Sequence, residues 1–408
     1  MDLSATTGTG VDASAYAIAG QPPRRVMRPA SRDELCEILR AAARDGQSVV
    51  PWGGGVALAH AARLERYDLA LDLTRLDRVV EYDPEDLTLT AECGIPLARL
   101  AALTAAKGQD FPLEAPHAGR ATLGGVLAAN ASGPRRLRLG SPRDRLLGAR
   151  FVLGDGTLAR TGGRVVKNVA GYAIHRLLCG SRGGLAILIE ASLKLLPQPG
   201  SRVALIYEAG AAEIADRTRW ASLLAREPAV LTVVGAAQAR ALPAAPRPGR
   251  FWVCVGLEED AAHVAEEEPR LRRMLGEPVA RLAGEEVAAL WQTLSDLEGS
   301  GPSRITLAGP QGTPGDLAPL LNDPAGVTAL EHIVFHAATG RLHLESDSDA
   351  TPKLLDAAET AGFRRIGTRP SGETAPVSSP TLALRTRIRE ALDPGRRFGL
   401  GDRWVHSR

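Results

Sequence analysis

Two glycine-rich segments contain the residues whose types and spacing could do chemistry. The first is Pro51-Trp-Gly-Gly-Gly-Val56, which directly follows the apolar run 48–52. Three successive glycines leave no Cβ atoms in the way, so consecutive backbone N–H groups can turn toward one concavity. Such a nest suits a pyrophosphate, although no Gly-Lys-Ser/Thr follows it and the dinucleotide pattern GxGxxG is absent. The alternative is a purely structural turn.

The second segment runs from Ala115 to Gly133, and nearly every side chain from Thr122 onward is small. A core helix of this length would not tolerate such a composition, because small side chains leave voids. Close backbone approach to something flat and bulky explains it better. Four groups could supply the polar contacts that a ring system and its phosphates require: the Thr122 hydroxyl, the amides of Gly124 and Gly125, and the Asn130 side chain.

A third candidate lies in the run His332–Glu345, which alternates around Thr339-Gly340 and so predicts a two-residue hairpin turn. That register places His336 opposite His343, with Glu345 diagonally adjacent on the same face. Two imidazoles and a carboxylate could bind a divalent metal or abstract a hydroxyl proton. The alternative is a hairpin whose polar residues face water, since histidine serves many structural roles.

The elements that must position these segments can be read from periodicity and turn residues. Ser31 is a good N-cap for the amphipathic stretch that follows it, and a proline is tolerated in the first turn of the helix that begins at residue 95. Helices are expected at 31–43, 95–103 and 172–179, and strands at 48–52, 69–73, 79–80, 87–89, 150–160 and 185–196. The 150–160 segment reads as two strands joined at Gly154-Asp-Gly156.

The second half repeats a strand-then-helix order after the cluster Pro197-Gln-Pro-Gly, which is typical of a domain boundary. Strands at 203–207 and 251–256 precede helices at 211–226 and 260–275, and a last helix spans 381–392. This order predicts a smaller α+β domain built on a sheet.

Composition excludes several classes of protein. The 408 residues include 49 basic and 47 acidic side chains, a net charge of +2, so no field of one sign gathers nucleic acid or an anionic membrane. Four cysteines, Cys36, Cys93, Cys179 and Cys254, lack the paired spacing of a zinc or iron–sulfur site. No apolar run reaches a bilayer-spanning length and no secretory leader is visible. We therefore expect a soluble, intracellular protein with no metal, and we interpret the arginine run 135–150 as a solvated or docking face.

Taken together, the motifs resemble the FAD-binding domain shared by vanillyl-alcohol oxidase and its relatives among 2-hydroxy-acid dehydrogenases. That family carries a PxGGG-like turn, a THxTIGG-like block ending in small residues, an arginine–aspartate pair, an LG-x-x-x-V-L-x-DG hairpin, and a KNVxGYDLxRLxxGSxGTLGxIxEAxLKL block. The corresponding stretches are 51–55, 121–133, 143–144, 147–156 and 167–194. Within the family, the chain is most similar to the smaller FAD-binding subunits of bacterial glycolate oxidases.

The resemblance implies an α+β fold: a two-subdomain FAD-binding fold of the vanillyl-alcohol oxidase type, followed by a smaller α+β cap domain. The implied domains are an amino-terminal segment (1–23), the FAD-binding domain (24–199), the cap (200–380), and a carboxy-terminal helix and tail that return to the FAD domain (381–408).

The resemblance also implies which residues contact FAD. The implied contacts are Trp52, Gly53, Gly54, Gly55 and Val56 for the pyrophosphate; Pro116, Thr122, Gly124, Gly125, Ala129, Asn130 and Ser132 for the ribityl chain and ring; and Ile187 and Ile189 near the adenine, where an ordinary strand core is the alternative. Covalent relatives use a histidine just after the turn, where this chain has Val56 and Ala57. We therefore expect non-covalent FAD.

Three functions are compatible with the resemblance. The first is an FAD-binding subunit of a glycolate oxidase complex in the cytoplasm, reaching a membrane only through that complex. Its partners would be a larger FAD-binding subunit, an iron–sulfur subunit and a small 2-hydroxy acid. The second is a self-sufficient FAD-linked D-2-hydroxy-acid dehydrogenase that uses His336, His343 and Glu345, because the hairpin resembles the FHAGDGNLH run of catalytic relatives. The third is a non-catalytic assembly subunit with a vestigial flavin fold.

Overall fold

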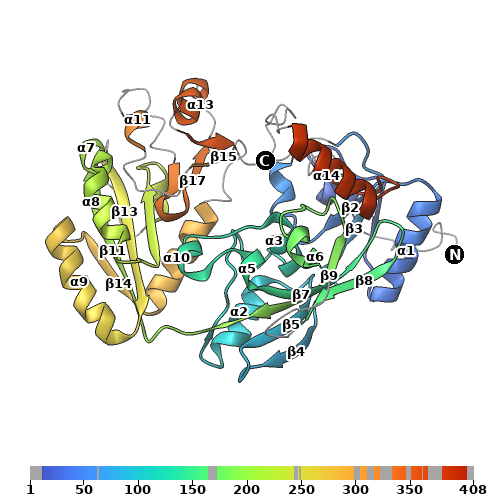
Figure 1. Ribbon diagram of the computed structural model, residues 1–408, viewed down its shortest axis with the longest axis horizontal. Helices are drawn as coiled ribbons and strands as arrows, with labels where there is room; N and C mark the ends of the chain where they lie inside the picture. The colour runs from blue at the N-terminus through green and yellow to red at the C-terminus, as the bar shows by residue number, and fades with distance from the viewer. Residues whose placement is uncertain are drawn as a thin grey trace. The chain divides into compact units, whose positions relative to one another are not determined.

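The computed structural model divides the chain into two compact units, which are described separately below (Figure 1). Unit 1 comprises residues 1–132, 141–198 and 368–408, and unit 2 comprises residues 133–140 and 199–367. The structure describes residues 12–61, 64–163, 172–242, 247, 250–297, 304–309, 317–321, 333–345, 351–360, 362–365 and 379–401.

Unit 1 begins with a small parallel sheet in the order β1-β3-β2. Its strands are β1 (Arg25–Met27), β2 (Val49–Trp52) and β3 (Leu69–Asp72), and helix α1 (Arg32–Arg44) joins the first two. The Ser31 hydroxyl accepts a hydrogen bond from the Glu34 N–H and so caps α1, as the sequence predicts. The carboxy-terminal segment extends this sheet, because the Val49 N–H donates to the Arg397 carbonyl and the Gly399 N–H donates to the Val49 carbonyl.

A five-stranded antiparallel sheet in the order β4-β5-β9-β7-β8 forms the rest of unit 1. Helix α3 (Leu123–Ala129) packs against β9 in the same hydrophobic core. The strands are β4 (Val79–Asp83), β5 (Thr88–Glu92), β7 (Leu146–Val152), β8 (Leu158–Gly162) and β9 (Ile187–Lys194), with a short pair β6 (Gln109–Asp110) and β10 (Leu196–Pro197). The remaining helices are η2 (Ala13–Tyr16), η3 (Leu58–His60), α2 (Leu97–Ala105), α5 (Pro142–Arg145), α6 (Ile174–Leu178) and α14 (Ser379–Leu392).

Unit 2 contains an eight-stranded antiparallel sheet in the order β14-β11-β13-β12-β16-β17-β15-β18. Its strands are β11 (Ser201–Gly210), β12 (Val230–Val234), β13 (Arg250–Glu259), β14 (Ala280–Ala283), β15 (Arg304–Ala308), β16 (Ile333–His336), β17 (Arg341–Glu345) and β18 (Arg364–Arg365). Its helices are α4 (Arg136–Leu139), α7 (Ala211–Ala215), α8 (Arg217–Leu224), η4 (Gln238–Ala241), α9 (Ala261–Leu275), α10 (Glu285–Leu297), α11 (Ala318–Leu321), η6 (Ala337–Thr339) and α13 (Thr351–Thr360).

Alternating strand residues build two cores on the two faces of this sheet. Leu205 faces a core that includes Trp220 of α8 and Val264 of α9. Its neighbour Ile206 faces the opposite core, which includes Trp291 of α10. This period of two is the pattern of a sheet that is covered on both faces. The expectation of an α+β fold is confirmed.

A buried carboxylate holds residues 133–140 in unit 2. The Glu258 side chain is 0% exposed and forms ion pairs with Arg135 at 3.3 Å and Arg138 at 3.2 Å. Arg202 lies 3.6 Å from the other carboxylate oxygen, which also accepts a 2.9 Å hydrogen bond from the Trp291 indole. The solvated arginine face expected from the sequence is therefore wrong for Arg135 and Arg138, because they compensate this buried charge.

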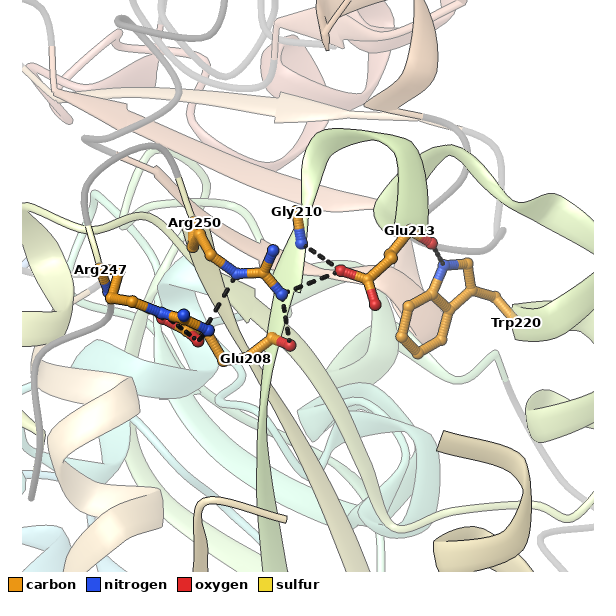
Figure 2. Close-up of polar contacts among 6 residues, drawn as sticks. All are labelled: Glu208, Gly210, Glu213, Trp220, Arg247 and Arg250. Carbon is orange, nitrogen blue, oxygen red and sulfur yellow. Dashed lines mark hydrogen bonds and ion pairs between the residues drawn. The ribbon is translucent and has the colours of Figure 1, made fainter. Parts of the chain in front are cut away.

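A second polar network lies at one end of β11 and β13 (Figure 2). Arg247 donates to the Glu208 carboxylate through both its side chain and its backbone N–H, and Arg250 lies 3.0 Å from Glu213. The Glu213 carboxylate also accepts a hydrogen bond from the Gly210 N–H, which fixes the start of α7. Hydrogen bonding to Arg247 lowers the pKa of Glu208 to about 2. This network joins β11, β13 and α7 by paired charges.

Candidate functional site

The glycine turn of unit 1 follows β2, which ends at Trp52. Within the described part of the chain, the N–H groups of Gly53, Gly54, Gly55 and Val56 donate no hydrogen bond. Most backbone N–H groups in a folded protein have a partner, so four consecutive N–H groups without one among the described residues are candidates to bind an acceptor from a ligand. Gly55 has φ +74°, a conformation that favours glycine. The turn therefore presents four donors of the kind that phosphate oxygens accept.

The structure brings the glycine turn and the small-residue segment together. A Cβ atom added to Gly53 would lie 2.2 Å from the Thr122 hydroxyl, and one added to Gly54 would lie 1.8 Å from the Arg120 carbonyl oxygen. The Arg120 guanidinium also donates to the Gly54 carbonyl at 3.2 Å. Two stretches about seventy residues apart in sequence therefore meet, and glycine is required because the second stretch fills the space beside the first.

Helix α3 lies within the second segment, and the hydrogen bonds of its first turn bear on the expectation that the amides of Gly124 and Gly125 face a ligand. Thr122 is its N-cap and accepts a hydrogen bond from the Gly125 N–H. The Gly124 N–H donates to the Cys93 carbonyl at 2.7 Å, and a Cβ on Gly124 would lie 2.8 Å from the Cys93 Cβ. The expectation that these two glycine amides face a ligand is wrong, because one caps the helix and the other holds it against the chain that follows β5.

The carboxy-terminal end of α3 carries a polar group suited to a ligand. Asn130 adopts a left-handed conformation with φ 49°, and its buried Oδ1 has no hydrogen-bond partner in the described part of the chain. Nearby, the Arg182 N–H donates to the Ala128 carbonyl. Burial, together with the positive charge of Arg385, lowers the pKa of Arg182. An orphaned buried acceptor fits a ligand hydroxyl such as those of the polyol chain of FAD.

The other expected contact residues lie in different settings. Pro116 and Ser132 are buried near the two ends of the segment 115–133, and Ala129 is half-buried in the last turn of α3. Ile187 and Ile189 belong to the hydrophobic core formed with α1 and the parallel sheet. The part of the last family motif that falls in residues 164–171 lies outside the described residues.

Two glycines of the last motif, Gly183 and Gly184, allow close approach to the residues before the glycine turn and to the carboxy-terminal segment. A Cβ on Gly183 would lie 2.6 Å from the Pro51 side chain, and one on Gly184 would lie 2.8 Å from the Gly401 Cα. Burial raises the pKa of Cys179, which packs at the edge of this core, to about 12 and so keeps its thiol neutral. These close approaches fix the residues that surround the glycine turn.

The two hairpin histidines meet in unit 2, but in a register that differs from the expected one. His336 pairs with Arg341 and His343 with Val334, so the two histidines are diagonal neighbours. The two-residue turn is wrong, because Ala337–Thr339 forms a 3-10 turn and lengthens the connection to four residues. Glu345 pairs with Arg304 in β15, and its side chain lies outside the described residues.

Each of these histidines already has a partner. Their ring centroids are 5.8 Å apart and the side chains are 2% and 4% exposed. The Nδ1 atom of His336 hydrogen-bonds the Thr232 hydroxyl at 2.8 Å, and that of His343 the Thr306 hydroxyl at 3.1 Å. Among the described residues, no group of three or more histidine, cysteine or acidic residues could hold a metal ion.

A model of the FAD binding domain family matches residues 23–162. The match covers part of the chain and bears out FAD as the cofactor that the motifs predict.

Curated relatives share this FAD-binding domain. The chain is 47% identical over 131 residues to glycolate oxidase subunit GlcE of Escherichia coli (strain K12), a match that covers 32% of this chain and 37% of that protein. It is 34% identical over 185 residues to D-2-hydroxyglutarate dehydrogenase of Xanthomonas citri pv. viticola, covering 45% and 39%. It is 33% identical over 184 residues to glycolate oxidase subunit GlcD of Bacillus subtilis (strain 168), covering 45% and 39%. The matches therefore span 37–39% of these relatives' own lengths.

Solved structures of alkyldihydroxyacetonephosphate synthase in two crystal forms share the fold. Their TM-scores are 0.69 and 0.66 at 16% identity, and each comparison covers 93% of this chain and 78% of the other. The chain therefore shares the fold of these structures. No helix in the described part of the chain is long and apolar enough to cross a membrane.

One residue beside the glycine turn was missed by sequence reasoning. Tyr16 lies in the amino-terminal segment, which has little hydrophobic periodicity, and its ring packs against Trp52 at 5.1 Å. A tyrosine without periodic neighbours gives no sequence signal for such a contact.

Proposed function

We propose that this chain is the FAD-binding subunit of a glycolate oxidase complex, which oxidises glycolate to glyoxylate and passes electrons to an iron–sulfur subunit. The similarity to glycolate oxidase subunits from two organisms supports the complex and its substrate class. An iron–sulfur partner is needed because four widely separated cysteines do not match the ligand spacing of a cluster. The cytoplasm, with membrane contact only through the partners, belongs to the same proposal.

The observation that carries the proposal is the set of four N–H groups, from Gly53 to Val56, that have no acceptor in the described chain. These groups would hold the pyrophosphate. They directly follow Trp52, the last residue of β2, which fixes where the turn begins. Two negative phosphates gain most from fixed donors that are already oriented and need no reorganisation on binding. The turn therefore acts as a preformed anion site.

The residues that follow would orient the rest of the cofactor. Asn130 would accept one hydrogen bond from a hydroxyl of the ribityl chain through its buried Oδ1, and the small residues of α3, with Pro116 and Ser132, would leave room for a flat ring. When bound, the flavin supplies the electron-accepting chemistry, and the protein contributes binding and orientation. The valine after the glycine turn gives no nucleophile for a covalent link, which supports non-covalent FAD.

Turnover with and without the partner subunits tests this proposal. The chain expressed alone, loaded with FAD and supplied with glycolate and a dye acceptor, should give little dye reduction. Addition of the two other subunits should restore it, and Gly54→Ala in the complex should lower it. Robust dye reduction by the chain alone would contradict the subunit role.

A second candidate is a self-sufficient FAD-linked dehydrogenase of a D-2-hydroxy acid. The observation that favours it is the ring contact of His336 with His343, together with similarity to D-2-hydroxyglutarate dehydrogenases. In this candidate the two imidazoles, with Glu345, would remove the hydroxyl proton. Anaerobic mixing of the FAD-loaded chain with a panel of 2-hydroxy acids separates the two candidates, since flavin bleaching that is lost when both histidines are replaced by alanine would favour the second.

A further inference from the structure

We propose that the amino-terminal arm, residues 12–22, sets the geometry of the phosphate turn, and that Tyr16 is its positioning residue. The proposal rests on the proposed function, in which the turn 53–56 holds the FAD pyrophosphate. The structural basis is that Tyr16 bridges the ends of β2 and β3 at the point where the chain enters the turn.

The first contact is made by the tyrosine ring. Its centroid lies 5.1 Å from that of Trp52, with the two planes at 59°. The Trp52 side chain also abuts the turn itself, because a Cβ on Gly55 would lie 3.1 Å from the indole. Trp52 is only 9% exposed, and its ring contacts both the arm and the turn. A change in the arm therefore reaches the turn through a single aromatic side chain.

The second contact is made by the tyrosine hydroxyl. It donates to the buried Asp72 carboxylate at 2.6 Å, and Asp72 is the residue that pairs with Trp52 across β2 and β3. The same carboxylate accepts from the Thr74 N–H and from Arg28, both at 2.8 Å. Desolvation and the carboxylate raise the pKa of Tyr16 to about 12, so the hydroxyl remains a donor at any ordinary pH. One residue thus fixes both strand ends that flank the turn.

The arm itself is firmly attached. Ile18 is fully buried, the Tyr67 hydroxyl donates to the Tyr16 carbonyl at 2.9 Å, and the Gln21 side chain accepts from the Leu64 N–H. These contacts orient Tyr16 independently of the turn. An anion site made of backbone N–H groups depends on their directions, so a residue that fixes the preceding strand end controls its affinity.

Ligand binding by two Tyr16 variants and one control variant tests the inference. Tyr16→Ala removes both contacts and should weaken FAD binding about tenfold, whereas Tyr16→Phe keeps the ring contact and should restore most of the affinity. The matched control is Tyr82→Phe, which removes a comparable hydrogen bond, to Gln109 at 2.8 Å, elsewhere in unit 1. Dissociation constants are measured by flavin fluorescence for FAD and riboflavin, and by calorimetry for ADP.

The choice of ligands separates positioning from general support of the fold. Loss of affinity for FAD and ADP by Tyr16→Ala, with riboflavin binding unchanged, is the expected result, because riboflavin has no phosphate. Equal loss for all three ligands, or affinities equal to those of the wild type, would overturn the inference while leaving the proposed function in place. A wild-type chain that binds neither FAD nor ADP would overturn both.

Discussion

Replacing Gly54 by alanine should separate the two segments that we propose to form the FAD site. The added Cβ would lie 1.8 Å from the Arg120 carbonyl oxygen, whereas real Cβ atoms essentially never come closer than 3.0 Å, so the backbones must move apart by more than about 1 Å. Overpacking of this kind costs about 1–3 kcal/mol, which predicts about 5- to 150-fold weaker FAD binding if the cost falls on the bound geometry. Titration of the apoprotein with FAD, followed by flavin fluorescence, measures the change.

Gly119→Ala is the matched control, because among the described residues, its two chain neighbours apart, no heavy atom lies within 4 Å of the position its Cβ would take. It adds the same methyl group two residues before the Ala121–Gly133 stretch and should leave FAD affinity and thermal stability unchanged. If Gly54→Ala binds FAD as tightly as Gly119→Ala does, the turn does not hold the cofactor and the reasoning fails.

Three further changes have defined outcomes. Asn130→Gly keeps the left-handed backbone but removes the buried amide, so FAD affinity should fall about five- to tenfold at unchanged thermal stability of the apoprotein. Glu258→Ala removes the buried charge with which Arg135 and Arg138 pair, so it should lower the free energy of unfolding in urea by about 3–5 kcal/mol and speed hydrogen exchange in β13; exchange like that of the wild type would contradict the ion cluster. Arg247→Ala should destabilise unit 2 by a constant amount above about pH 4.5, and this difference should shrink as pH falls toward 2, because Glu208 with its lowered pKa loses its charge there; pH-dependent unfolding measures it.

The elements and the meeting of the two glycine-rich segments could be predicted from sequence. Helix α1 with its Ser31 cap and the β7–β8 hairpin follow from local capping and turn chemistry, which depends on neighbouring residues alone. The approach of residues 53–54 to 120–122 follows from the resemblance, which assigns both stretches to one cofactor, and the structure shows that glycine is needed there because the two backbones come this close.

The rest depends on contacts that distant residues make in the fold. Gly124 could be recognised as a close-approach position, but only the fold shows that Cys93, and not a ligand, fills the space beside it. The hairpin register was wrong because Thr339-Gly340 looks like a two-residue turn, whereas the preceding residues form a 3-10 turn. Arg135 and Arg138 read as surface charge because their partner, Glu258, lies more than a hundred residues away.

Hydrogen exchange of the glycine turn, with and without FAD, tests the central claim most directly. The N–H groups of residues 53–56 donate no hydrogen bond in the described chain and should exchange quickly in the apoprotein. Saturating FAD should slow their exchange strongly, with little change in β4, which is remote in sequence from both segments of the site. Equally fast exchange at residues 53–56 in a protein that has bound its flavin would contradict the account.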